Sequence, residues 1–160
     1  MVALLAIDTT EDWEAYRLGK QYGEPHGTFF TDEQLVIPGV HVHGATIRTG
    51  ERVNGVGIDI TPSGGQRTTT YHRGDGGKAQ TLTLNSGERF KCVEAHCKYH
   101  GRTRVRFINV TTTTGRWVAG GTPAPDAAGK DCAPDGFQLG GWYGSSGVEL
   151  DQVGAVWTNN

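Results

Sequence analysis

The chain has 160 residues, with 15 Lys and Arg against 17 Asp and Glu, for a formal net charge of −2. A nucleic-acid-binding domain needs a basic surface to neutralise phosphates, so this balance argues against a nucleic-acid partner. No stretch approaches the ~20 consecutive apolar residues of a membrane-spanning helix, so we expect no insertion into a membrane. The length suits one domain with one core.

Glycine supplies 25 residues, without the Gly-X-Y period of collagen. The glycines separate short runs in which apolar residues alternate with polar ones. This pattern is typical of an all-β chain with many tight turns.

The N-terminal segment has no clear element. Residues 1–7 are apolar but lack a basic region and meet Asp8 at once, so they make a poor signal peptide. We therefore expect a cytoplasmic or non-classically secreted protein. Residues 9–20 fit either one or two helical turns or an extended leader. We expect residues 1–22 to form an N-terminal extension and residues 23–160 to form the domain.

An internal repeat dominates the rest of the chain. Three segments share one frame after a glycine: 50–60 (GERVNGVGIDI), 87–97 (GERFKCVEAHC) and 147–157 (GVELDQVGAVW). In each of them, apolar residues recur with a period of two from the sixth position onward, which predicts a half-buried strand. Another strand-like run precedes each glycine, at residues 45–49, 80–86 and 136–146. The repeat thus predicts three hairpins, and from them three small antiparallel sheets around one core.

Two other runs, residues 68–72 and 102–111, also predict strands. Residues 119–134 are rich in Gly, Pro, Ala and Asp, which predicts a long surface loop.

The three cysteines cannot all pair within one chain. Cys92 and Cys97 are separated by an odd number of positions, so they fall on opposite faces of a strand. Any disulfide would join one of them to Cys132, and three free thiols is the simpler interpretation. With His96 and His100 these cysteines suggest zinc, but their spacing is wider than a structural zinc site requires, so we expect no metal.

Four segments in order resemble the jacalin-related lectins of the mannose/glucose type. They are residues 23–32 (GEPHGTFFTD), 47–55 (IRTGERVNG), 71–77 (YHRGDGG) and 140–156 (GGWYGSSGVELDQVGAV). The resemblance extends from Gly23 to Trp157. It implies an all-β fold, a β-prism of three Greek-key antiparallel sheets with pseudo-threefold symmetry. It also implies a lectin that binds glycans without a cofactor, as a homodimer.

The resemblance further implies which residues hold the sugar. Carried over by motif, the ligand-binding residues are Gly27, Gly147, Val148, Glu149 and Asp151. The chemistry is consistent, because an ionised Asp accepts hydrogen bonds from two sugar hydroxyls while turn N–H groups donate to the sugar oxygens. Tyr143 or Phe29 is a candidate to cover the apolar face of the ring.

The other two repeats allow a weaker second site and a blind one. The possible second site comprises Gly50, Glu51, Arg52, Asn54 and Gly74. Lys91 stands at the third equivalent position and cannot accept a hydrogen bond, so that repeat should not bind sugar. The galactose-specific branch of the family needs a cleaved chain with a new N-terminal glycine. Gly27 lies inside this intact chain, which favours mannose or glucose.

Three other interpretations compete with the lectin. Asp151 alone is compatible with a residue that caps its own turn. Glu149 and Asp151 together resemble the carboxylate pair of a glycosidase, but they share one hairpin rather than facing each other across a cleft, so we expect no catalysis. The main alternative is a non-catalytic β-prism that serves interaction or targeting, associated with a toxin or an enzyme, whose sugar site is decayed or altered.

Overall fold

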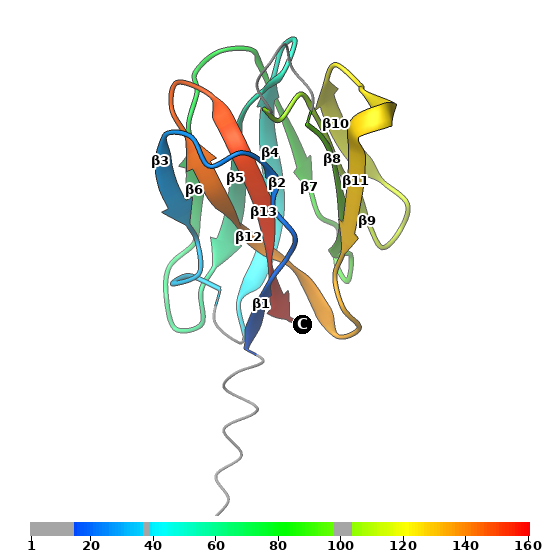
Figure 1. Ribbon diagram of the computed structural model, residues 1–160. Helices are drawn as coiled ribbons and strands as arrows, with labels where there is room; N and C mark the ends of the chain where they lie inside the picture. The colour runs from blue at the N-terminus through cyan, green and yellow to red at the C-terminus, as the bar shows by residue number, and fades with distance from the viewer. Residues whose placement is uncertain (1–14, 37–38, 98–103) are drawn as a thin grey trace, which may run out of the picture.

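Three antiparallel sheets stand around a common core in the computed structural model, which describes residues 15–36, 39–97 and 104–160 (Figure 1). The fold class predicted from the repeat is confirmed. The alternating residues build each sheet with one apolar face, and the three apolar faces meet inside.

We call the sheets I, II and III in chain order of their central hairpins. Sheet I has the strand order β6 (Thr68–His72), β5 (Val53–Thr61), β4 (His41–Thr49) and β7 (Lys78–Thr83). Sheet II has the order β10 (Trp117–Gly121), β9 (Phe107–Thr112), β8 (Phe90–His96) and β11 (Ala128–Cys132). Sheet III has the order β1 (Tyr16–Leu18), β13 (Leu150–Asn159), β12 (Phe137–Ser146) and β3 (Thr28–Thr31), and β2 (Tyr22–Gly23) also pairs with β13.

Two of the three predicted hairpins are confirmed, β4–β5 and β12–β13. The middle one is wrong. β7 pairs with β4 in sheet I, whereas β8 pairs with β9 and β11 in sheet II, so the Gly87 turn carries the chain from one sheet to the next. The same local pattern, two strand-like runs joined by a glycine turn, fits a hairpin within one sheet or a connection between two sheets. The pattern does not indicate which strand each run pairs with.

The true middle repeat includes Arg104 and the residues that follow it. The carbonyl O of Asp151 accepts a hydrogen bond from Glu24 N (3.1 Å), and that of Arg106 accepts one from Thr122 N (2.9 Å). A Cβ built on the preceding glycine, Gly23 or Gly121, would lie 2.1 Å from the same carbonyl O in both cases.

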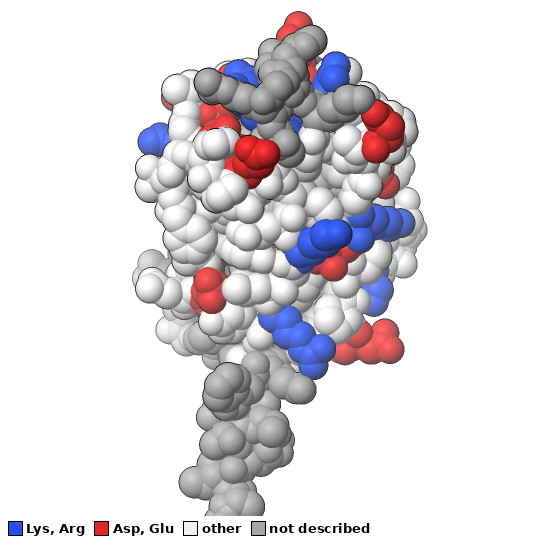
Figure 2. Space-filling view, viewed as in Figure 1, with Lys and Arg blue, Asp and Glu red and all other residues white. Residues whose placement is uncertain are grey.

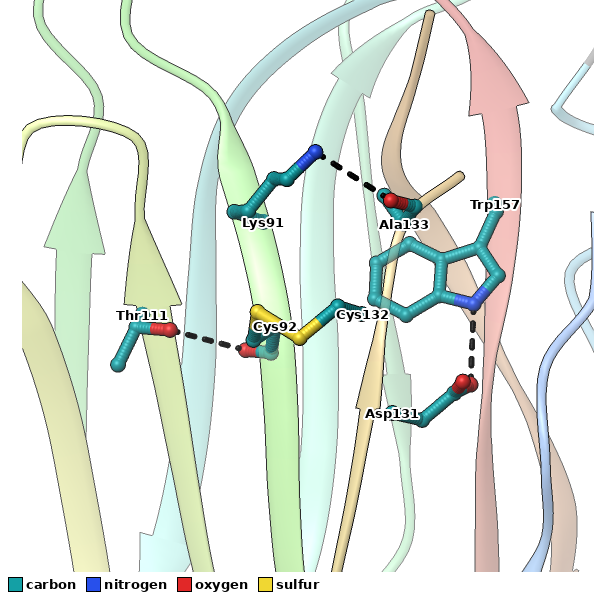
Figure 3. The surroundings of a disulfide bond; sticks show 7 residues. All are labelled: Lys91, Cys92, Thr111, Asp131, Cys132, Ala133 and Trp157. Carbon is teal, nitrogen blue, oxygen red and sulfur yellow. Dashed lines mark hydrogen bonds between the residues drawn. A yellow bond between two sulfur atoms is a disulfide. The ribbon is translucent and has the colours of Figure 1, made fainter. Parts of the chain in front are cut away.

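Sheet I has the equivalent close approach of a glycine to a strand carbonyl, since a Cβ on Gly74 would lie 2.4 Å from the carbonyl O of Asn54. The counterpart of Asp151 and Asn54 is therefore Arg106, and the prediction that Lys91 holds this position is wrong. Lys91 instead donates to the carbonyl O of Ala133 (3.3 Å; Figure 3).

The corrected repeat explains the core. Val53, Val105 and Leu150 occupy the same position in the three sheets, and all three are fully buried. Val56, Ile108 and Val153, three positions further on, are fully buried as well. Each sheet thus gives equivalent side chains to one shared interior.

Residues 119–134 do not form the predicted surface loop. β10 extends to Gly121, Pro125–Ala127 form a short 3₁₀ helix, and Ala128–Cys132 pair with β8. β11 is an edge strand whose residues are all exposed or half-buried, so its sequence lacks the apolar alternation by which the other strands are found.

At the N-terminus, Tyr16–Leu18 and Tyr22–Gly23 pair with β13. The segment predicted as an extension thus contributes to sheet III from Tyr16 onward, and it does so as strand rather than helix. Residues 9–14 of the proposed helical turns lie outside the described residues, and the domain boundary itself stays a prediction.

The expectation of three free thiols is wrong, and the alternative disulfide is the one that forms. Cys92 and Cys132 lie opposite each other on β8 and β11 and are bonded, as Figure 3 shows. Cys97 is free, and burial raises the pKa of its thiol to about 11. The disulfide fastens β11, which has little apolar surface of its own, to the centre of sheet II.

Candidate functional site

Two equivalent turns mark one end of the molecule. In the β12–β13 turn, Gly147 N donates to the carbonyl O of Glu149 (3.0 Å), and in the β4–β5 turn Gly50 N donates to that of Arg52 (2.9 Å). Val148 forms the tip of the first turn and is 86% exposed. The turn itself thus uses the Gly147 N–H.

Gly27 lies directly on the β12–β13 turn. Its φ is +80°, and a Cβ at this position would lie 2.4 Å from the carbonyl O of Ser146 and 2.7 Å from Gly147 N. In Figure 1 the segment between β2 and β3 crosses beside the loop that joins β12 to β13. Glycine is therefore required here, because the positive φ disfavours other residues and because there is no space for a Cβ.

A hollow of about 360 Å³ adjoins this turn. It is lined by His26, Arg52, Arg104, Gly147, Val148, Glu149 and Asp151. The structure thus brings together four of the predicted ligand residues, with Gly27 packed against the turn that carries them. The Asp151 side chain is 12% exposed, so it is nearly buried at this hollow.

Two arginines give the hollow an electrostatic character that the motif did not predict. Arg52, from the β4–β5 turn, forms an ion pair with Glu149. The Nε of Arg104, from the connection between β8 and β9, lies 4.0 Å from Oδ1 of Asp151. Arg104 was missed because the middle repeat was aligned on Gly87, and aligning it on Val105 would have found it.

The possible second site is partly assembled. Asn54 is 8% exposed, and a Cβ on Gly74 or Gly77 would clash with its backbone or side chain. Oδ1 of Asn54 is buried and has no hydrogen-bond partner among the residues that the structure describes. The Arg52 side chain instead forms its ion pair with Glu149 in the first hollow. The carbonyl O of Glu51 accepts a hydrogen bond from the Thr122 hydroxyl (2.7 Å). Asn54, Gly50 and Gly74 therefore lie together, while Arg52 does not join them.

The two aromatic candidates, Tyr143 and Phe29, differ in exposure. Tyr143 is 8% exposed and its hydroxyl donates to the carbonyl O of Gly19, so the prediction that it covers a sugar ring is wrong. Phe29 is 62% exposed. It lines a separate groove of about 1000 Å³ that runs from Val148 to Gly74.

The glycosidase and zinc interpretations depend on how the candidate side chains are arranged. Glu149 and Asp151 lie on the same turn, and each faces an arginine rather than the other carboxylate. Within residues 15–36, 39–97 and 104–160, no group of three His, Cys, Asp or Glu side chains is arranged to hold a metal ion. His100 lies outside these ranges. Among the same residues no helix is long and apolar enough to cross a membrane.

The charges on the surface are mixed. Figure 2 shows Lys and Arg side chains interspersed with Asp and Glu on the face it displays, rather than gathered into one basic patch. This face lacks the continuous positive surface that a phosphate backbone requires.

Residues 19–156 match the jacalin-like lectin domain family. The chain belongs to this family. Among solved structures, this jacalin-like domain is similar to Malaysian banana lectin, with 19% identity and a TM-score of 0.75 over 90% of this chain and 99% of that one. It is also similar to a mannose-binding jacalin-related lectin from Ananas comosus, with 18% identity and a TM-score of 0.72 over 91% and 99% of the two chains.

A relative of a different kind is the secreted RxLR effector protein 19 of Plasmopara viticola. It is 26% identical over 160 residues, which cover 98% of this chain and 88% of the effector. The chain is thus similar in fold to plant lectins and similar in sequence to a secreted effector.

Proposed function

We propose that this jacalin-like domain binds glycans of the mannose/glucose type through the hollow at the β12–β13 turn, and that it catalyses no reaction. The observation that carries the proposal is the position of Asp151, whose carboxylate faces a hollow formed by the exposed turn and braced by Gly27. A carboxylate accepts hydrogen bonds from two neighbouring hydroxyls, and we expect the backbone N–H groups of Val148 and Glu149, which line the same hollow, to donate to that sugar.

Two further points support the mannose/glucose branch. Gly27 is an internal residue of this chain, whereas the galactose-specific branch of the family uses an N-terminal glycine. The neighbour from Ananas comosus is a mannose-binding lectin. Single shallow sites of this kind bind weakly, so we also propose that a homodimer gains affinity by engaging one glycan surface at several sites.

Calorimetric titration with methyl α-mannoside and methyl α-galactoside tests the proposal. We expect the mannoside to bind the wild type more tightly than the galactoside. Asp151→Ala should lower the affinity by about tenfold or more, because hydrogen bonds to a charged group contribute about 1.5–3 kcal/mol. The control is Asp135→Ala, which removes an exposed carboxylate from the turn before β12.

Circular dichroism of both variants verifies that they fold. Mannoside binding that survives Asp151→Ala in a folded protein would place the site elsewhere. Absence of binding to both sugars and to a glycan array would remove the lectin proposal.

The second candidate is a non-catalytic interaction or targeting module. Arg104 beside Asp151 alters the charge of the sugar site, and the effector relative supports a secreted interaction role. A folded wild type that is silent on a glycan array favours this candidate.

A further inference from the structure

The sequence contains a single Asn-X-Ser/Thr triplet, Asn109-Val110-Thr111, which is the acceptor motif for N-linked glycans. The triplet lies on β9, between β8 and β10 in sheet II. Ile108 and Val110 are fully buried in the core, and side chains alternate between the two faces of a strand. Asn109 therefore lies on the outer face of the sheet, away from the core.

The side chain of Asn109 is open at the nitrogen to which a glycan is attached. Its Oδ1 is buried, but its Nδ2 is not, and no residue that the structure describes accepts a hydrogen bond from Nδ2. On β10 the residue opposite Asn109 is Ala119, whose methyl group leaves space beside the amide. On β8 the residue opposite is Glu94, whose carboxylate pairs with Nε2 of His96 (2.7 Å). A glycan on Nδ2 thus displaces no hydrogen bond of the described protein.

An exposed tryptophan lies on the same face of sheet II. Trp117 is 63% exposed, whereas Trp142 and Trp157 are buried in the core. Trp117 pairs with Thr111, two positions from Asn109 along β9, so it is a diagonal neighbour of the acceptor residue. Such neighbours are about 7–8 Å apart, within reach of an aromatic side chain. The indole ring is therefore placed to cover the apolar face of the first sugar of a glycan on Asn109.

The disulfide beside the triplet indicates an oxidising compartment. Cys92 and Cys132 are bonded, and the carbonyl O of Cys92 accepts a hydrogen bond from the Thr111 hydroxyl (3.5 Å; Figure 3). Structural disulfides form and persist in the endoplasmic reticulum and outside the cell, and they are rare in the cytosol. The disulfide thus favours the secretory route, in which N-linked glycans are attached, over the cytoplasmic location expected from residues 1–7.

We propose that Asn109 carries an N-linked glycan and that the first sugar of this glycan packs on Trp117. In the transfer, Nδ2 of Asn109 forms a C–N bond with the anomeric carbon of a lipid-pyrophosphate-linked oligosaccharide. The anomeric C–O bond breaks, the lipid pyrophosphate leaves with the bonding electron pair, and the Nδ2 proton passes to a base of the transferase. The inference is independent of the proposed function, because it concerns a glycan attached to this chain rather than one bound by it.

The test is expression of the full chain behind a cleavable secretion leader in a eukaryotic host, followed by intact-mass spectrometry before and after peptide-N-glycosidase. We expect the wild type to carry one glycan, which the enzyme removes. Thr111→Ala should abolish the modification although Asn109 is still present. Thr111→Ser is the matched control, since it keeps the acceptor motif, and it should retain the glycan.

The cell extract is measured together with the medium, because the glycan is transferred to the extended chain before β9 pairs. A variant that folds or secretes poorly therefore still reports on the acceptor. Wild-type protein that enters the secretory route and keeps its unmodified mass overturns the inference. A glycan that persists in Thr111→Ala overturns it as well, since the attachment would then be at another residue.

The role of Trp117 has a measurement of its own, urea unfolding of protein made with and without an inhibitor of N-glycan synthesis. We expect the glycan to raise the urea midpoint of the wild type and to leave that of Trp117→Ala unchanged. Phe29→Ala is the matched control, because Phe29 is equally exposed, at 62%, but lies on sheet III. It should show the wild-type shift. Equal shifts in the wild type and Trp117→Ala, or no shift in the wild type, would show that the sugar does not pack on the indole.

Discussion

Gly27 is required at the candidate site for two separable reasons, its backbone conformation and its contact with the neighbouring turn. Gly87, in the turn that joins sheets I and II, has nearly the same φ, +79° against +80°. A Cβ on Gly87 would have nothing within 4 Å, whereas one on Gly27 would lie 2.4 Å from Ser146 O. The two positions therefore separate backbone strain from steric overlap.

We predict that Gly87→Ala lowers the free energy of unfolding by about 1–2 kcal/mol, the cost of a side chain in the left-handed region. Gly27→Ala should cost more than this, because the segment must also move off the turn. It should weaken the binding of methyl α-mannoside, which Gly87→Ala leaves unchanged. Urea unfolding and calorimetry measure the two effects, and equal losses in both variants would show that the contact with Ser146 does not matter.

The candidate residues also show how far single positions are predictable. Asp151, Gly147 and Gly27 were predicted from the resemblance, whose motifs are local in the sequence, and the structure brings them together at the β12–β13 turn. Arg104 was not found, because its place at the hollow depends on how the strands of sheet II are paired. Repeat alignment on a glycine misled here, whereas alignment on the buried Val53, Val105 and Leu150 gives the correct frame.

At the scale of the elements, the turn between β7 and β8 is fixed by one buried carboxylate. Glu88 accepts hydrogen bonds from Asn85 N (2.9 Å), from the Thr112 hydroxyl (2.6 Å) and from the Thr114 hydroxyl. It also accepts one from the Arg116 guanidinium (2.6 Å). These bonds join the turn to the β9–β10 hairpin. The backbone N–H of Asn85, followed by the two hydroxyls, lowers the pKa of Glu88 to about 2 from the usual 4.5.

This shift sets a direction for the pH dependence of stability. A carboxylate whose pKa is lowered by folding stabilises the protein above its unfolded pKa, and the contribution is lost as the pH falls toward the folded value. We predict that the urea midpoint of the wild type falls between pH 5 and pH 2, and that Glu88→Gln is less stable at pH 7 but changes less over this range.

Glu51→Gln, which alters an exposed residue of the β4–β5 turn, is the control and should follow the wild type. Parallel curves for the wild type and Glu88→Gln would show that other groups determine the acid sensitivity.

At the scale of the whole molecule, the sheets are joined by a small number of polar links as well as by the core. Asp32, which follows β3 in sheet III, is 2% exposed and lies against sheet I. Its carboxylate accepts from Trp142 N (2.9 Å) and pairs with Nε2 of His72 (2.7 Å). The ring of His72 stacks on Phe30, with centroids 4.1 Å apart. Trp142 extends the link, since its Nε1 donates to the carbonyl O of Gly57 (3.0 Å).

The fold class followed from the sequence because three sheets with apolar inner faces are encoded in a period of two. The partners of β7 and β8 did not follow, and neither did β11. The alternation of apolar and polar residues indicates which face of a strand is buried, but it does not indicate which neighbouring strand it pairs with. An edge strand held by a disulfide, such as β11, needs no alternation at all.

The importance of the link between sheets III and I can be measured with a pair of aspartates. Asp32→Ala leaves the Trp142 N–H buried without an acceptor, and we predict that it lowers the free energy of unfolding by about 1–3 kcal/mol. Asp59→Ala removes an equally close carboxylate–cation pair, with Arg67 at 2.7 Å, but Arg67 is 61% exposed and the pair lies within sheet I. Surface pairs of this kind contribute less than about 1 kcal/mol. Urea unfolding of the two variants compares them directly. If Asp59→Ala costs as much as Asp32→Ala, the burial of this polar link and its position between two sheets add nothing beyond what an exposed pair contributes.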